Sequence, residues 1–103
     1  MGIYEAQAYG HLSDDEIFSQ ISCEGCGSTK VVDHPGAIYD RHKNRYDLVL
    51  AFVRGSADVR VGDHVYHCVR GDKLNIPGDM PHSAVIGAHG AVYFMTQVEN
   101  CAD

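Results

Sequence analysis

Apolar and polar residues alternate with two different periods along this chain. Near the N-terminus, Ile17 and Ile21 belong to an apolar stripe with helical spacing. Ser13 and Glu16 lie just before it with the spacing of a capping box, in which each side chain caps a backbone amide of the first turn. The pattern therefore predicts one short helix at about residues 12–22.

From about residue 30 onward the period changes to two, and residues typical of turns recur roughly every 6–12 positions. The segment 48–53 is a continuous apolar run, as in a buried strand, whereas 57–61 alternates like a half-buried strand. We expect a turn at 54–56 and two separate closing strands at 83–86 and 91–97. Short strands at this spacing predict an all-β domain, an antiparallel sandwich or barrel.

Length and charge limit the kinds of protein that this chain could be. Its 103 residues suffice for a single domain, which we expect to span 1–103. The formal net charge is −6, so the Lys/Arg excess that nucleic-acid binding requires is missing. No apolar run approaches the length of a membrane span, and the first residues do not have the pattern of a secretory signal. We therefore expect a cytoplasmic protein with neither nucleic acid nor membrane as a partner.

The most specific motif of the chain lies at residues 71–82. Gly71, Pro77 and His82 stand at the spacing of the second motif of the cupin family, G-x5-P-x-G-x2-H, although its inner glycine comes one place early, at Gly78. The chain resembles small single-domain bacterial cupins. This resemblance implies a double-stranded β-helix, or jelly-roll barrel, at about 30–98, with the helix preceding it and any site at the barrel mouth.

The first motif of the cupin family, G-x5-H-x-H-x3,4-E-x6-G, is only partly present, and two registers are possible. In one register, His42 is the second histidine, and Asp40 and Asp47 replace the first histidine and the glutamate. In the other, His42 is the first histidine, Asn44 replaces the second, and Leu48, which cannot bind a metal, replaces the glutamate. At least one of the usual ligands is therefore replaced in either register.

The resemblance implies a site for a divalent transition metal, normally held by three histidines and one carboxylate. The candidate ligands here are His42, Asp47 and His82, and the candidate ions are Fe, Mn, Ni and Zn. A barrel that has lost its metal and keeps His82 as a pocket residue is an equally open alternative. Further candidate pocket residues are Asp40, Arg41, Leu48, Leu50 and Tyr93.

Two functions follow from these alternatives. One is a metal-dependent enzyme of the isomerase or dioxygenase type, acting on a small molecule at the barrel mouth. The other is a metal-free cupin that binds or senses a small molecule in an apolar pocket marked by Leu48 and Leu50. The resemblance also implies a homodimer, because exposed edge strands are protected when they pair.

Cys23 and Cys26 form a C-x2-C pair, which is half of a structural zinc site. No second such pair follows, so a zinc-binding protein is the weaker alternative, and a glycine-rich turn with incidental thiols explains the pair as well. In a chain without an export signal we expect the cysteines to be reduced.

Overall fold

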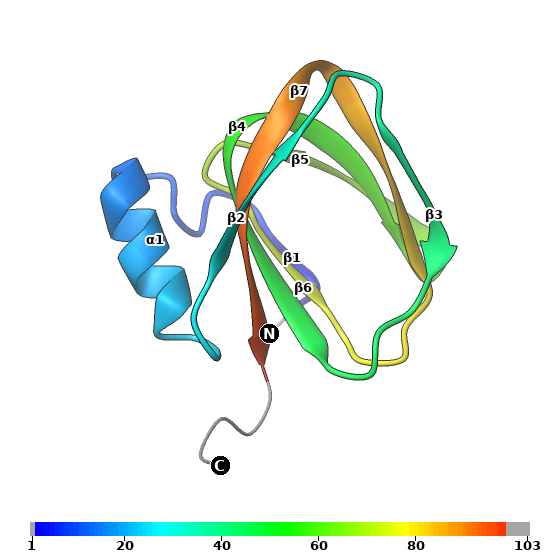
Figure 1. Ribbon diagram of the computed structural model, residues 1–103, viewed down its shortest axis with the longest axis horizontal. Coiled ribbons are helices and arrows are strands. Elements are labelled where there is room, and N and C mark those ends of the chain that lie inside the picture. The colour runs from blue at the N-terminus through cyan, green and yellow to red at the C-terminus, as the bar shows by residue number, and fades with distance from the viewer. Residues whose placement is uncertain (1, 99–103) are drawn as a thin grey trace.

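The computed structural model describes residues 2–98, which form one helix and seven strands around a barrel (Figure 1). The helix is α1 (Asp14–Ser22). The strands are β1 (Tyr4–Glu5), β2 (Thr29–Asp33), β3 (Ile38–His42), β4 (Asp47–Val61), β5 (His64–Val69), β6 (Lys73–Ile76) and β7 (His82–Val98). The all-β prediction is confirmed.

All strand pairs are antiparallel, and β4 and β7 pair with each other along most of their length. The first half of β4 also pairs with β6, and its second half pairs with β5. In the same way, the second half of β7 pairs with β2 and its first half pairs with β3. The two long strands thus bend through both walls of the barrel and enclose its interior.

The apolar run at the start of β4 is buried on both of its faces. Leu50 and Phe52 belong to the core inside the barrel. Val49 and Ala51, which alternate with them, belong to a second core beneath α1, together with Ile17 of the helix. Because a strand sends successive side chains to opposite faces, a run without alternation requires cover on both sides. Here the barrel interior and α1 provide it.

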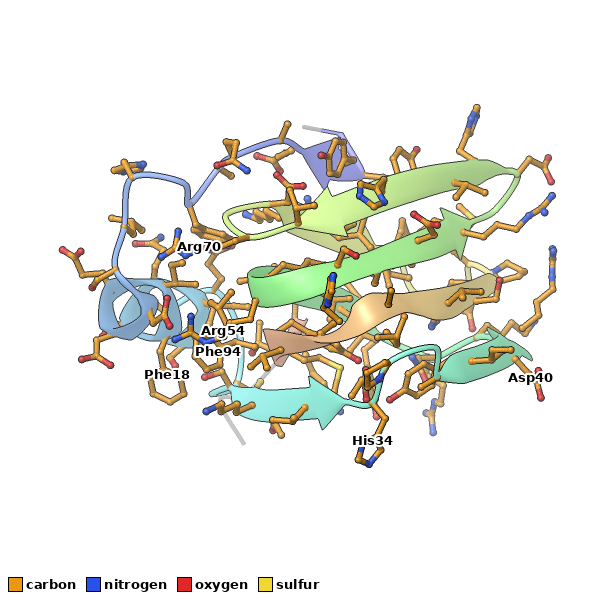
Figure 2. The ribbon with its side chains drawn as sticks, turned by 90° about the horizontal axis from the view of Figure 1, so that it is seen from above. Phe18, His34, Asp40, Arg54, Arg70 and Phe94 are labelled. Carbon is orange, nitrogen blue, oxygen red and sulfur yellow. The ribbon has the colours of Figure 1, made fainter. Side chains whose placement is uncertain are left out.

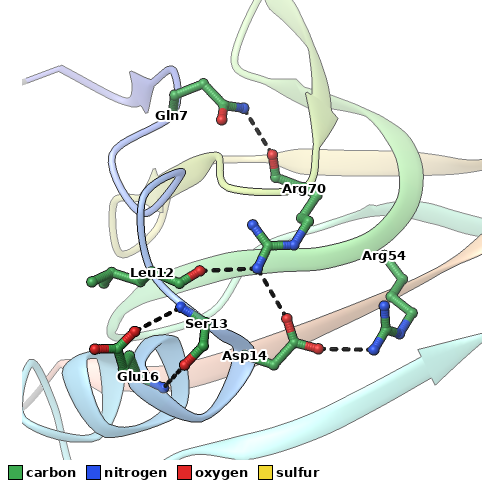
Figure 3. A network of polar contacts seen from close by, with 7 residues as sticks. All are labelled: Gln7, Leu12, Ser13, Asp14, Glu16, Arg54 and Arg70. Carbon is green, nitrogen blue, oxygen red and sulfur yellow. Dashed lines mark hydrogen bonds and ion pairs between the residues drawn. The ribbon is translucent and has the colours of Figure 1, made fainter.

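The N-terminal helix begins at the predicted capping box, which is present in full: the Ser13 side chain accepts from the Glu16 amide, and the Glu16 carboxylate accepts from the Ser13 amide. Asp14 follows the cap and forms ion pairs with Arg54 and Arg70 of the barrel, at 2.9 and 3.1 Å (Figure 3). The first turn of α1 is therefore tied to the barrel by charge as well as by its apolar face.

The predicted turn at 54–56 is wrong, because β4 continues through it with irregular register around Gly55. Gly55 has a φ of 68°, and a Cβ atom there would overlap the carbonyl oxygen of Gly90. The glycine thus lets two strands approach each other where both bend, which a local pattern cannot distinguish from a turn. For the same reason, the two strands expected at 83–86 and 91–97 are one strand, β7.

The acid of the second motif, Asp72, has a structural role that the sequence did not reveal. Its side chain is buried, with 1% of the residue exposed. It accepts hydrogen bonds from the Tyr4 hydroxyl, the Gln7 amide and side chain, and the Val69 amide. Asp72 therefore fastens the N-terminal segment to the turn between β5 and β6.

The helix has nine residues, and no helix in the described part of the chain is long and apolar enough to cross a membrane.

Candidate ligand-binding site

The barrel contains a cavity of about 330 Å³ that is open to solvent on one side, and its walls are mainly apolar. The lining residues are Val31, Tyr39, His42, Asn44, Tyr46, Leu48, Leu50, Phe52, Ala57, Val59, Ile76, His82, Ser83, Ala84, Ile86, Tyr93, Met95 and Gln97. Within the described part of the chain, this lining contains no Asp, Glu, Lys or Arg side chain. The expected pocket residues Leu48, Leu50 and Tyr93 are all part of it. The few polar groups of the lining belong to histidine, tyrosine, serine and amide side chains.

Two histidines meet in the cavity wall. His42, the last residue of β3, pairs in register with His82, the first residue of β7. Their rings pack edge to face with centroids 4.3 Å apart. His82 is buried, with 7% exposed, whereas His42 lies at the surface, so the pair extends from the solvent into the barrel.

Both imidazoles are anchored in the same way, by the backbone two residues earlier. Nδ1 of His42 lies 2.8 Å from the carbonyl oxygen of Asp40, and Nδ1 of His82 lies 3.0 Å from that of Met80. A carbonyl oxygen can only accept, so each Nδ1 must carry the proton. In the neutral rings each Nε2 therefore has a lone pair and no proton.

The surroundings of His82 favour its neutral form. Burial lowers the pKa of this imidazole below its usual range, and proximity to His42 lowers it further. The hydrogen bond to the Met80 carbonyl opposes these effects without outweighing them. At pH 7, then, His82 offers an acceptor at Nε2.

A carboxylate outside the cavity lining holds two tyrosines of the cavity wall. Asp33, at the end of β2, accepts from the Tyr39 hydroxyl at 2.5 Å and from the Tyr93 hydroxyl at 2.8 Å. Burial and the bond to Asp33 together raise the pKa of Tyr93 well above its usual range. The three residues come from β2, β3 and β7, so this contact links β2 and β3 to each other and to β7, the strand with which both of them pair. Nothing in the local sequence marks Asp33 as a residue of the site.

The structure does not bring the predicted acids to the histidines. Asp47 lies outside the cavity lining, and its carboxylate accepts from the Gly78 amide at 2.7 Å. Asp40 and Arg41 are exposed on β3 and are also absent from the lining. Figure 2 shows Asp40 at the end of the molecule remote from α1, with its side chain turned outward.

No family model and no curated protein matches this chain in sequence. Solved structures do match in fold. An RmlC-like cupin from Shewanella frigidimarina superposes with a TM-score of 0.63 and 23% identity, over 73% of this chain and 68% of that one. KdgF from Halomonas sp. gives 0.62 and 20%, over 72% and 69%.

Oxalate decarboxylase from Bacillus subtilis gives a TM-score of 0.66 at 23% identity, over 74% of this chain but only 22% of its own length. The chain has the cupin fold. The resemblance seen in residues 71–82 is thus confirmed for the fold, and identities this low leave activity to be argued from the site itself.

The cavity distinguishes between the two registers of the first motif. All four positions of the second register line it, namely His42, Asn44, Leu48 and the motif-two residue His82. Asp47 of the first register does not, because it lies next to Leu48 on β4 and successive strand residues face opposite sides. The carboxylate position of the site is therefore occupied by a leucine.

These side chains do not fit a transition metal of the usual cupin type. The two anchored imidazoles suit an ion, since ligating histidines commonly donate their other nitrogen to a carbonyl. A third strong ligand is missing, however: in residues 2–98, no three His, Cys, Asp or Glu side chains come close enough to hold an ion. His42 and His82 are brought together, and Asp47 is kept apart from them.

The cysteines differ from the sequence-based expectation. Cys26 is disulfide-bonded, so the expectation of reduced thiols is wrong at this position, while Cys23 and Cys68 are free thiols. A sulfur in a disulfide is not a thiolate ligand. This state of Cys26 argues against a zinc site at Cys23 and Cys26.

Proposed function

We propose that this cupin binds a small organic molecule with an apolar body inside its barrel, without a metal. The observation that carries the proposal is the cavity of about 330 Å³, whose walls, as far as residues 2–98 form them, have no carboxylate, ammonium or guanidinium group. Apolar cavities with a few convergent polar groups are the usual form of small-molecule sites. The polar groups here are centred on His82 and His42.

The volume limits the size of the ligand. An engineered cavity of ~150 Å³ holds benzene, which corresponds to ~25 Å³ for each non-hydrogen atom. By that measure this cavity takes a molecule of about 13 non-hydrogen atoms. A ligand of one or two rings fits that limit, whereas a nucleotide or an oligosaccharide is too large.

The metal-dependent enzyme is less well supported, because Leu48 takes the place of a carboxylate in the cavity and Asp47 is bonded elsewhere. Two imidazoles without a third ligand hold an ion more weakly than a complete set. What supports the metal-free proposal is therefore the chemistry of the side chains present.

A pair of substitutions on one strand tests the proposal. Ala84 lines the cavity, and its neighbour Val85 is 50% exposed on the opposite face of β7. Ala84→Phe adds a ring inside the cavity, whereas Val85→Phe adds the same ring outside. Binding of a panel of one- and two-ring molecules, followed by ligand-observed NMR, is expected for the wild type and Val85→Phe and is expected to be lost in Ala84→Phe.

Elemental analysis of the wild-type protein, prepared without a tag and without chelator, tests whether the site binds its ligand without a metal. The proposal expects less than one tenth of a transition metal ion per chain, on the order of adventitious binding. One ion per chain, lost on His82→Leu, would overturn it and favour a metal-dependent enzyme. Panel binding that survives Ala84→Phe would show that the cavity is not the site.

A further inference from the structure

We propose that the ligand of this cavity carries a hydroxyl group that donates a hydrogen bond to Nε2 of His82, so that the site selects small phenols and alcohols over ethers and carboxylates. This inference rests on the proposed function and names its ligand class. It follows from whether each fixed polar group of the cavity can donate or accept a hydrogen bond.

His82 presents a hydrogen-bond acceptor to the cavity. Its Nδ1 must donate to the Met80 carbonyl, so Nε2 of the neutral ring can only accept. No buried side-chain nitrogen or oxygen in residues 2–98 lacks a partner. Nε2 has none among the hydrogen bonds of these residues, so it is not sealed in protein, and since His82 lines the cavity, that is where Nε2 meets solvent or ligand.

The other anchored groups of the cavity wall also present acceptors to a ligand. Nδ1 of His42 donates to the Asp40 carbonyl, leaving Nε2 of its neutral ring as an acceptor. The hydroxyls of Tyr39 and Tyr93 donate to Asp33, so their oxygens keep only lone pairs for a ligand. Four wall groups are thus preset as acceptors.

These acceptors disfavour two classes of ligand, carboxylates and ethers. A ligand carboxylate would bring negative charge against lone pairs, unless it first protonated His82, which the burial of this ring opposes. An ether oxygen would leave Nε2 desolvated and unpaired, which costs free energy. A hydroxyl satisfies Nε2, and in the neutral state it adds no charge to the apolar interior.

The side chains of Asn44, Ser83, Tyr46 and Gln97 complete the polar lining. Amide and hydroxyl side chains can turn to donate or to accept, so they adapt to a second polar group without setting the preference. His82 is therefore the residue on which the selectivity depends.

Two probes that differ by one methyl group test this inference. 2-Naphthol and 2-methoxynaphthalene have the same ring system, and only the first can donate a hydrogen bond. Both are titrated by calorimetry at pH 7.5 into the wild-type chain. The hydroxyl probe is expected to bind about tenfold more tightly, because the ether leaves a buried acceptor unpaired.

His82→Leu removes the acceptor and keeps an apolar side chain, so the two probes are expected to bind this variant with equal affinity. His34→Leu is the matched control, since His34 lies in an exposed loop and points outward (Figure 2), and it should keep the tenfold preference. Should His82→Leu not fold, the wild-type comparison still tests the preference for a hydroxyl, and His82→Gln, which keeps a polar side chain, takes the place of His82→Leu and is expected to reduce that preference.

The outcomes separate the two proposals. Equal binding of both probes to the wild type, lost in Ala84→Phe, overturns the hydroxyl inference and leaves the binding function in place. Tighter binding of the ether has the same consequence. A preference for 2-naphthol that persists in His82→Leu overturns the role of His82. If neither probe shows saturable binding, the proposed cavity function fails together with the inference.

Discussion

The ammonium group of Lys73 lies 2.6 Å from the carboxylate of Glu24, and both side chains are largely buried, with 15% and 21% exposed. The other oxygen of Glu24 accepts from the Tyr9 hydroxyl at 2.8 Å. Glu24 follows α1 and Lys73 begins β6, so this pair fastens the end of the helical segment to the barrel.

The first prediction is that Glu24→Gln lowers the free energy of unfolding at pH 7 by about 1–3 kcal/mol, because it leaves Lys73 unpaired. Burial alone would raise the pKa of Glu24, but the hydrogen bonds from Lys73 and Tyr9 outweigh it and hold that pKa below 4.5. A lowered folded-state pKa gives stability above the unfolded-state value that is lost as pH falls through the folded value.

The cost of Glu24→Gln should therefore shrink as pH falls from 4.5 through the folded-state pKa of Glu24, as urea unfolding at a series of pH values will show. Asp15→Asn removes the same charge from an exposed side chain near the start of α1 and serves as control. A penalty for Glu24→Gln that is equal at pH 7 and pH 3 would contradict the role of this ion pair.

The second prediction is that Asp72→Asn destabilises the fold by about 2–4 kcal/mol. The carboxylate accepts hydrogen bonds at both of its oxygens, and in asparagine one of these oxygens is replaced by an NH2 group, which can only donate. Thermal unfolding followed by circular dichroism measures the loss. Asp63→Asn, on an exposed turn, should change stability by less than about 0.5 kcal/mol. Similar effects of the two substitutions would show that the contacts of Asp72 contribute little.

The third prediction concerns the tyrosines held by Asp33. Tyr93→Phe removes the hydrogen bond from the Tyr93 hydroxyl to Asp33, and Tyr39→Phe removes the hydrogen bond that joins β3 to β2 through Asp33. We expect amide hydrogen exchange in β2 to accelerate about three- to tenfold in Tyr39→Phe, with no change in the centre of β4. Uniform acceleration throughout the barrel would instead indicate a global loss of stability.

Features encoded within a few residues were predictable from sequence. The capping box at Ser13 and Glu16 involves only its own turn, and the structure contains it as predicted. The spacing from Gly71 to His82 likewise specifies a turn, a short strand and a second turn, and so indicates the fold. These signals are strong because the partners that satisfy them are neighbours in the chain.

Features that depend on distant partners were not predictable. Gly55 has the appearance of a turn residue, but its conformation is required by the approach of Gly90, 35 positions later (90 − 55 = 35). Asp72 is indistinguishable in sequence from an exposed turn acid, because its Tyr4 and Gln7 partners lie more than 60 residues away. Only the folded chain shows which glycine bends a strand and which carboxylate is buried.

The candidate site was predicted in part. His82 and His42 were named for their positions in the two motifs, and they meet in the cavity wall. The choice between Asp47 and Leu48 depended on which of two adjacent strand residues faces inward, and the motif spacing left that open. An uninterrupted apolar run gives no alternation from which to read the inner face.

Because β4 and β7 belong to both walls of the barrel, they determine which strands can separate from it most easily. These two strands are paired with each other along most of their length, whereas in residues 2–98 β2 and β3 each pair with β7 and not with each other. β2 and β3 follow one another along β7, and at the junction between them Asp33 bonds to Tyr39, so we expect local opening of the barrel at this junction. For the proposed ligand, affinity and residence time would consequently depend on different residues: on His82 for the strength of binding, and on Asp33 for the rate of release.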